Sequence, residues 1–236
     1  MDGTGATLAC PMHRRLRMKI YLSRFYAFLA QPLRPVSRVV LATLAVPLAL
    51  AFFQPLWRIS MEAPQYPAGL YLDIYAHTVE GGNGGQHLQE INTLNHYIGM
   101  RTLDRAAMTD LDWIPFALGA LLIFALRVAA IGNVSSLVDL AVATFYVSAF
   151  AFGRFVYTLW VFGHHLKPDA PVKVPGFMPA VLGSKQIANF TTHSGPREGS
   201  FLLGVFVLGV LGVLLFHLVA GRREAVRQAA LAGAAA

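Results

Sequence analysis

The chain has 236 residues, of which 56% are hydrophobic and only 13% are charged. Soluble domains contain about 45–50% apolar and about 25% charged residues, so this composition excludes an ordinary soluble enzyme and indicates an integral membrane protein. The single cysteine, Cys10, excludes a secreted module held together by disulfides. The formal net charge of +7 could suit nucleic acid, but the positions of the basic residues favour another explanation.

Four stretches are apolar enough to cross the roughly 30 Å hydrocarbon core of a bilayer. They predict transmembrane helices over residues 39–57, 113–131, 137–163 and 200–220. Pro47 lies inside the first stretch and predicts a kink there. A very short connection follows residue 131, which predicts a tight helical hairpin with Ser135 or Ser136 as the cap of the third helix.

Lys and Arg are distributed unevenly between the connecting segments, and this bias sets the orientation by the positive-inside rule. Seven of them precede the first predicted helix and three follow the last. Residues 58–112 instead hold three arginines and seven acidic residues, which leaves a formal charge of −4. We therefore expect both termini in the cytoplasm and the chain in the bacterial inner membrane. Contact with anionic lipid then explains the basic excess, and a nucleic-acid partner has no remaining support.

The expected fold is an all-α integral membrane protein that carries a small α+β domain on its outer side. Residues 1–38 form a cytoplasmic basic segment, in which residues 17–29 predict an interfacial helix. Residues 221–236 form a cytoplasmic tail. Residues 58–112 form the extracytoplasmic loop domain, and residues 164–199 form a second extracytoplasmic loop.

The first outer segment contains two recognisable patterns. Leu70, Leu72 and Ile74 alternate with polar or aromatic residues and predict a strand that is half buried. Apolar residues at helical spacing predict a short amphipathic helix over residues 86–100. Such a helix is too short to be stable alone, so we expect it to pack on the strand or on the membrane surface.

Candidate metal ligands occur in both outer segments. His96 and Met100 are four residues apart and would share one flank of the predicted helix. An imidazole and a thioether on one flank would suit copper. His164 and His165 follow the third predicted helix and would lie at the membrane surface on the same side. The alternative interpretation is a solvated histidine beside a methionine that closes the helix.

Charged residues inside the predicted spans need a partner or access to water. Arg127 and Asp139 lie at similar depth on the two arms of the hairpin, so we expect an ion pair between them. Arg154 has no acid available within the spans, and we expect it to contact a lipid phosphate, a backbone carbonyl or a partner subunit.

Signatures of an active site are missing from the sequence. It has no pair of carboxylates placed for hydrolysis and no glycine-rich phosphate loop after a strand. It also lacks the internal repeat and broken helices that are typical of transporters. We therefore expect a protein that is not an enzyme; an enzyme or transporter acting through Arg154 would require a water-filled cavity that reaches this residue.

Two stretches resemble a family of uncharacterised bacterial four-span membrane proteins, whose genes lie near those for nitrous-oxide reductase and other copper enzymes. The first stretch runs from residue 63 to residue 100 and ends in LNHYIGM, and the second covers residues 163–190 and begins with a Gly-His pair. The chain departs from the family pattern at Ala68, where an acidic residue is usual, and at Phe177, where Met is usual. An acidic and aromatic run is also missing before the Gly-His pair.

The resemblance implies a non-catalytic accessory subunit or maturation factor of a copper-dependent membrane or periplasmic enzyme, which could bind copper on its outer face. His96, Met100 and His164 coincide with the family pattern and would be the ligands, with His165 and Met178 in reserve. Contacts with lipids, with other integral membrane subunits or with a copper enzyme are expected at Arg154, Asn92, Tyr97, Lys185 and Asn189. The alternative is a purely structural subunit of a respiratory or oxidase complex that holds no metal and uses LNHYIGM as a docking surface.

Overall fold

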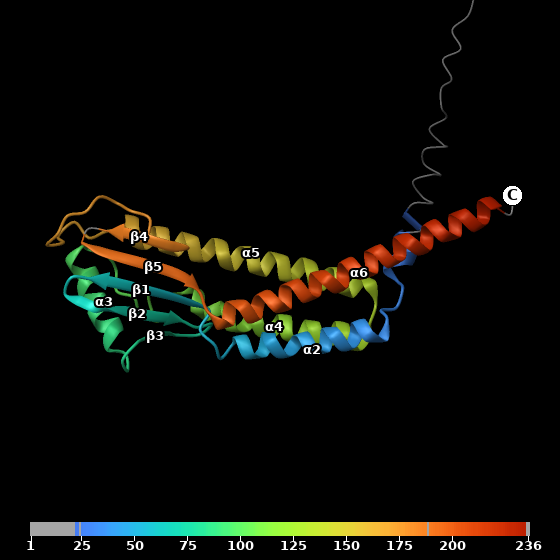
Figure 1. Ribbon diagram of the computed structural model, residues 1–236, viewed down its shortest axis with the longest axis horizontal. Coiled ribbons are helices and arrows are strands. Elements are labelled where there is room, and N and C mark those ends of the chain that lie inside the picture. The colour runs from blue at the N-terminus through green and yellow to red at the C-terminus, as the bar shows by residue number, and fades with distance from the viewer. Residues whose placement is uncertain (1–21, 24, 188, 235–236) are drawn as a thin grey trace, which may run out of the picture.

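The computed structural model describes residues 22–23, 25–187 and 189–234. Long helices run side by side along the molecule, and a small sheet domain lies at one end of them (Figure 1). The helices are α2 (Pro35–Ala51), α4 (Asp110–Ile131), α5 (Val134–His164) and α6 (Glu198–Ala234). Helices α4 and α5 and the part of α6 from Glu198 to Glu224 are long and apolar enough to cross a membrane. Helix α2 is apolar but has only 17 residues.

The first predicted span ends earlier than expected. Helix α2 continues through Pro47 and stops at Ala51, whereas the prediction extended it to Trp57. Trp57 instead begins a strand, and its indole Nε1 donates a hydrogen bond to Ser194 Oγ at 2.7 Å. Residues 17–21 and 24 of the predicted interfacial helix lie outside the described residues; residues 22–23 and 25–29 within it are helical.

The predicted hairpin between α4 and α5 is present, although its cap was wrongly assigned. Gly132 ends α4 in the left-handed conformation (φ +69°), which glycine adopts without strain. Asn133, rather than Ser135 or Ser136, caps α5, because its side-chain oxygen accepts a hydrogen bond from the backbone N–H of Ser136.

The four helices pack as a bundle in which α2 contacts α4 and α6, and α5 contacts the same two helices. Leucine, valine, alanine and one phenylalanine fill its centre, among them Leu41, Leu48, Val128, Leu137 and Phe206. Around this core, many large apolar side chains of the same helices point outward and are exposed. A bundle that is apolar both inside and outside suits a hydrocarbon environment.

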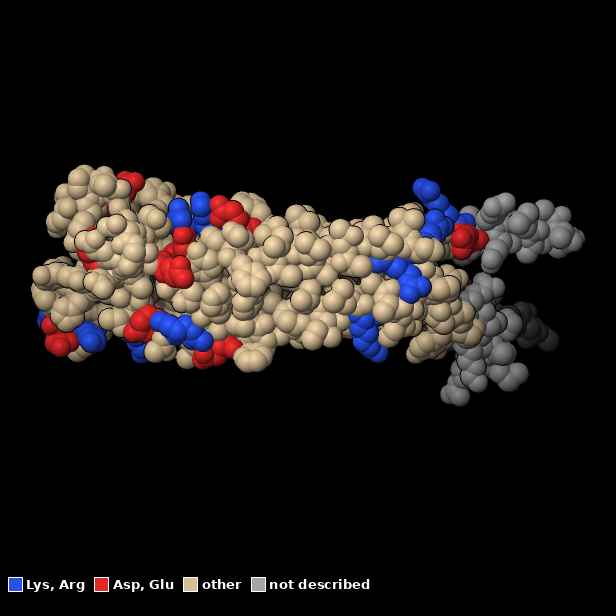
Figure 2. Space-filling view, turned by 90° about the horizontal axis from the view of Figure 1, so that it is seen from below, with Lys and Arg blue, Asp and Glu red and all other residues tan. Residues whose placement is uncertain are grey.

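An uncharged band separates the two ends of the bundle. On α4 no charged residue occurs between Asp112 and Arg127, and on α5 none occurs between Asp139 and Arg154. Each interval spans about 22 Å at helical rise. The face of the molecule in Figure 2 shows this band between the charged residues of the sheet domain and the basic residues at the opposite end. The predicted ion pair of Arg127 with Asp139 is wrong, because both side chains are exposed and no ion pair joins them in the described chain.

The two outer segments fold into one antiparallel sheet with the strand order β3-β2-β1-β5-β4. Strands β1 (Trp57–Ala63), β2 (Tyr66–Ile74) and β3 (Val79–Gly81) come from the first segment, and β4 (Gly183–Ile187) and β5 (Phe190–Pro196) come from the second. The central pairing of β1 with β5 places Ser60 opposite His193. The prediction of a strand near Leu70 is confirmed by β2, but the sequence analysis missed the other four strands and the pairing that makes one domain of both segments.

One face of this sheet is apolar and packs against α3 (Gln86–Tyr97) and the last turns of α5. The core of the domain combines residues of β1, β2, α3 and α5, including Met61, Leu72, Ile91 and Phe162. At 31 residues α5 extends about 46 Å, which exceeds the roughly 30 Å of a bilayer core. Its final turns therefore project beyond the bundle and lie beside the sheet (Figure 1).

Candidate functional site

Helix α3 carries most of the LNHYIGM motif and packs as its periodicity predicts. Ile91, Asn95 and Ile98 are buried, and Leu88 and Leu94 are half buried. The prediction of a short amphipathic helix that packs on the strand is therefore confirmed, because the apolar side of α3 belongs to the core of the sheet domain. Its polar flank, with His96 and Tyr97, is exposed.

The end of α3 is fixed by Gly99. Its backbone has φ +75°, a conformation that favours glycine. Its carbonyl oxygen accepts a hydrogen bond from the backbone N–H of Lys167 at 2.8 Å, and the carbonyl of Tyr97 accepts one from Val172 at 2.9 Å. A β-carbon at position 99 would lie 2.7 Å from the Lys167 carbonyl oxygen. The motif therefore ends where the backbone of the second outer segment touches it.

At the Gly-His pair, Gly163 and His164, the end of α5 also comes close to the backbone of the second outer segment. The carbonyl of Gly163 accepts a hydrogen bond from the backbone N–H of Phe177 at 3.0 Å. A β-carbon on Gly163 would overlap the carbonyl oxygen of Phe177, and one on Gly176 would lie 3.2 Å from the ring of His164. We call the region where residues 95–100, 163–165 and 167–177 meet the outer junction. It unites the two stretches on which the family resemblance rests.

The structure separates two of the predicted copper ligands. Helix α3 ends at Tyr97 and Gly99 turns the chain, so Met100 is no longer one helical turn from His96. Met100 packs into the apolar core of the sheet domain, whereas His96 is exposed. The prediction that both side chains share one flank of a helix is therefore wrong.

The remaining predicted ligands lie at the outer junction. His164 and His165 are exposed, and Met178 is half buried. The Nδ1 atom of His164 lies 3.0 Å from the carbonyl oxygen of Trp160, and the two rings stack with their centroids 4.7 Å apart. Within the described part of the chain, no three His, Cys, Asp or Glu side chains are grouped so that they could hold a metal ion. The predicted ligand set thus fits copper only in part, through His164.

An aromatic ladder leads up α5 to His164. The guanidinium of Arg154 lies over the ring of Tyr157 at 5.4 Å, Tyr157 stacks on Trp160, and Trp160 stacks on His164. Tyr157 is 52% exposed and Trp160 is 41% exposed. We call these four residues the α5 ladder. The sequence analysis missed its two aromatic members, although their spacing of three or four residues places them on one helix face.

Arg154 has an acidic partner that the sequence analysis did not find. Its Nε atom donates a hydrogen bond to Asp110 Oδ1 at 2.8 Å, and Thr158 donates to the other carboxylate oxygen at 2.8 Å. Trp113 also donates to Asp110. Asp110 begins α4, three residues before the predicted span. The expectation that Arg154 lacks an acid is corrected, and this ion pair marks the outer edge of the uncharged band.

The other predicted contact residues have different environments. The side chain of Asn92 is used within the domain, because its amide donates to the Leu103 carbonyl and accepts from the Leu103 backbone N–H. Tyr97 has an exposed ring at the outer junction. Lys185 lies exposed on β4, and Asn189 lies in the turn between β4 and β5, also exposed. Asn92 thus fixes the 100–108 loop against α3, and its contact with a partner stays a prediction.

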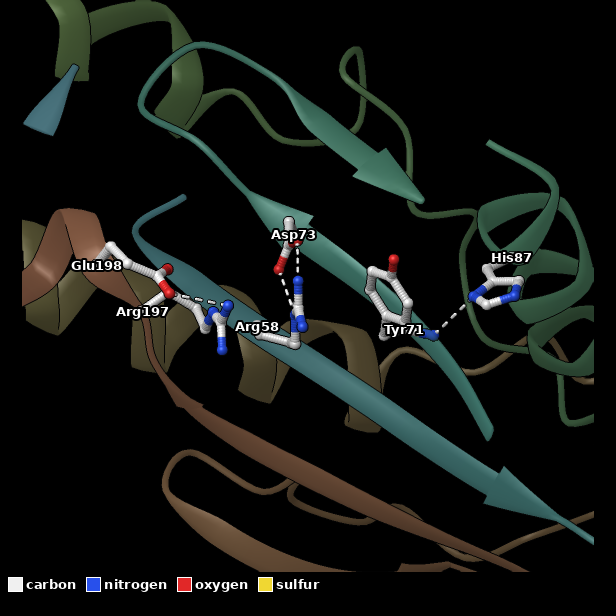
Figure 3. A network of polar contacts seen from close by, with 6 residues as sticks. All are labelled: Arg58, Tyr71, Asp73, His87, Arg197 and Glu198. Carbon is white, nitrogen blue, oxygen red and sulfur yellow. Dashed lines mark hydrogen bonds and ion pairs between the residues drawn. The ribbon is translucent and has the colours of Figure 1, made fainter. Parts of the chain in front are cut away.

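The other face of the sheet carries a polar network (Figure 3). Arg58 on β1 pairs with Asp73 on β2 through Nε at 2.7 Å and Nη2 at 2.5 Å, and its guanidinium lies over the ring of Tyr71. The hydrogen bonds that Arg58 donates to the carboxylate of Asp73 raise the pKa of Arg58 above its ordinary value. His87 Nδ1 accepts a hydrogen bond from the backbone of Tyr71 at 3.3 Å. These contacts fix β1 against β2 and join β2 to α3.

The comparisons with known proteins add no relative. No protein-family model matches the chain, and no curated protein matches its sequence. Its function must therefore be inferred from the geometry.

Proposed function

We propose that the chain is a non-catalytic accessory subunit of the bacterial inner membrane, whose outer domain docks against a copper-dependent membrane or periplasmic enzyme. The α5 ladder is the observation that carries this proposal. Its aromatic rings are held in order by stacking and by the ion pair of Arg154 with Asp110, yet they remain exposed beside the outer junction. Ordered, exposed Tyr and Trp side chains are typical of binding hot spots and of membrane interfaces.

The proposal includes four spans with both termini inside. Helix α2 would cross as the fourth span: its 17 residues cover about 26 Å, and Phe52 and Phe53 extend its apolar surface. Basic residues at the end opposite the sheet domain, among them Arg34, Arg38, Arg222 and Arg223, support a cytoplasmic location for that end. The sheet domain and the α5 ladder would then face the outer compartment.

Copper enters the proposal through the family resemblance and through one feature of His164. A metal-binding histidine usually donates its second ring N–H to a carbonyl or carboxylate. His164 Nδ1 is placed to donate in this way to the Trp160 carbonyl, which leaves Nε2 for a metal. His164, with His165 or His96, would share the ion with ligands of the partner, because no three His, Cys, Asp or Glu side chains of the described residues are grouped around one position. Copper chemistry itself would belong to the partner enzyme.

The test compares two exposed aromatic residues of α5. Tagged protein with Trp160→Ala should recover about tenfold less copper-containing subunit from native membranes than the unmodified chain, because it removes the centre of the ladder. The matched control is Phe152→Ala, which removes an exposed ring below the ladder and should not change recovery. The measurements are the yield of the co-purified subunit and its copper content.

Equal recovery with both variants would contradict the proposed docking surface. Recovery of a partner that contains no copper would favour the alternative, a purely structural subunit of a respiratory or oxidase complex. Copper content that is unchanged in a His96→Ala variant would remove His96 from any metal site.

A further inference from the structure

A cavity of about 70 Å³ lies in the centre of the outer domain. The apolar face of the sheet forms one wall, α3 and the 100–108 loop form a second, and the outer turns of α5 form a third. Its lining is almost entirely apolar and includes three methionines, Met61, Met100 and Met108. A space of this size could hold several waters, but apolar walls offer them few partners, and such cavities bind apolar molecules instead.

One polar group in this cavity has no partner. Asn95 on α3 lines the cavity and is 1% exposed, and its Nδ2 atom makes no hydrogen bond. The two other polar residues of the lining are satisfied: Thr158 donates to Asp110, and Thr192 donates to the carbonyl of Lys185. A buried N–H group without an acceptor is unfavourable, so this amide is the one place where a ligand would gain a hydrogen bond.

The chemistry of the walls decides what that ligand is. A hard cation is disfavoured because the unpaired group is an N–H donor and no acidic residue lines the cavity. An acceptor oxygen on an apolar body satisfies both the donor and the walls. The thioether side chains of the three methionines adapt to differently shaped apolar groups.

The cavity also lies beside the membrane boundary. Phe155 and Thr158 contribute to its lining and are only partly buried, directly beyond the ion pair of Arg154 with Asp110 that ends the uncharged band of α5. A lipophilic molecule that partitions into the bilayer reaches this depth without crossing the aqueous phase.

We propose that this cavity is a binding site for an uncharged, lipophilic molecule that carries a carbonyl group, which accepts a hydrogen bond from Asn95. The site is independent of the docking surface proposed above, because it rests on different residues and on a different observation.

The experiment uses the full chain in detergent and two probes of the same shape. Acetone and isobutene, which suit a cavity of about 70 Å³ better than larger ketones, differ only in a carbonyl oxygen in place of a methylene group. The measurement is the affinity for acetone divided by the affinity for isobutene; comparing this ratio between two proteins cancels the different costs of removing the probes from water. The ratio should be about fivefold to tenfold lower in the Asn95→Leu variant, of similar size and without the donor, which is the effect of one hydrogen bond to a buried donor.

A second variant tests the cavity itself. Ala180→Leu adds apolar volume to the lining and should lower the affinity for both probes, although Asn95 remains in place. Xenon binding, followed by xenon chemical shift, should be present in the unmodified chain and reduced in Ala180→Leu. A ratio of the two affinities that is the same in the unmodified chain and in Asn95→Leu would overturn the proposal. So would the absence of any probe binding.

Discussion

The Gly163→Ala variant should lose stability, although alanine is the better helix former. Gly163 is buried in the last turn of α5, where an added β-carbon would overlap the backbone carbonyl of Phe177. A backbone atom cannot move aside as a side chain can, so the outer junction must shift. We expect a loss of about 1–3 kcal/mol, the usual range for overpacking, and a lower unfolding temperature in detergent.

The matched control is Gly153→Ala in the same helix. Nothing lies within 4 Å of a β-carbon at that position, so only the helix propensity changes. Alanine should therefore stabilise by about 0.5–1 kcal/mol. Unfolding temperatures that change in the same direction for both variants would contradict the close approach at Gly163.

The Gly99→Ala variant should be destabilised for two reasons. Its φ of +75° is strained for any L-residue with a side chain, which costs about 1–2 kcal/mol. The β-carbon would also press on the backbone of Lys167, which adds an overpacking penalty of about 1–3 kcal/mol. Thermal unfolding of the purified chain measures the sum.

Gly84→Ala separates these two effects. Gly84 also has a positive φ, of +64°, but a β-carbon there would meet nothing within 4 Å. The control should therefore show the backbone strain alone and lose clearly less stability than Gly99→Ala. Equal losses would mean that the contact between α3 and the second outer segment contributes nothing.

The helices could be predicted from the sequence because their signal is local. Long apolar runs between charged residues mark α4, α5 and α6, and the structure confirms them as apolar helices of spanning length. The amphipathic pattern of α3 likewise predicted this helix from local sequence alone. The number of spans and their orientation stay predictions, since they depend on where the membrane lies.

The sheet could not be predicted in the same way, because its central pairing joins residues 129 to 139 positions apart. Strand β5 alternates buried and partly buried residues, but its inward side chains include Thr192 and Ser194. Their hydroxyl groups bond to carbonyls of the chain, so a polar sequence forms a buried strand. A search for alternating apolar residues therefore does not recognise β5 as a strand.

The candidate site shows how one glycine can change a prediction. His96 and Met100 would share one helix flank only if α3 continued through residue 100. The helix ends at Tyr97, and the positive φ of Gly99 turns the chain away. The partner of Arg154 was overlooked for a related reason. Asp110 lies outside the apolar run by which the span was recognised, yet α4 begins there and brings its carboxylate to Arg154.

A disulfide cross-link between β1 and β5 tests most directly whether both outer segments form one domain on one side of the membrane. Cysteines introduced as Ser60→Cys and His193→Cys, with Cys10→Ser, replace residues that are opposite each other in the register, at a Cα separation that a disulfide accepts. We expect them to form a disulfide in cells and to resist labelling by a maleimide polymer until reduced. The control pair Ser60→Cys with Lys185→Cys points to opposite faces of the sheet, and because Lys185 is exposed this pair should accept two labels. Full labelling of the first pair without reduction would contradict the account.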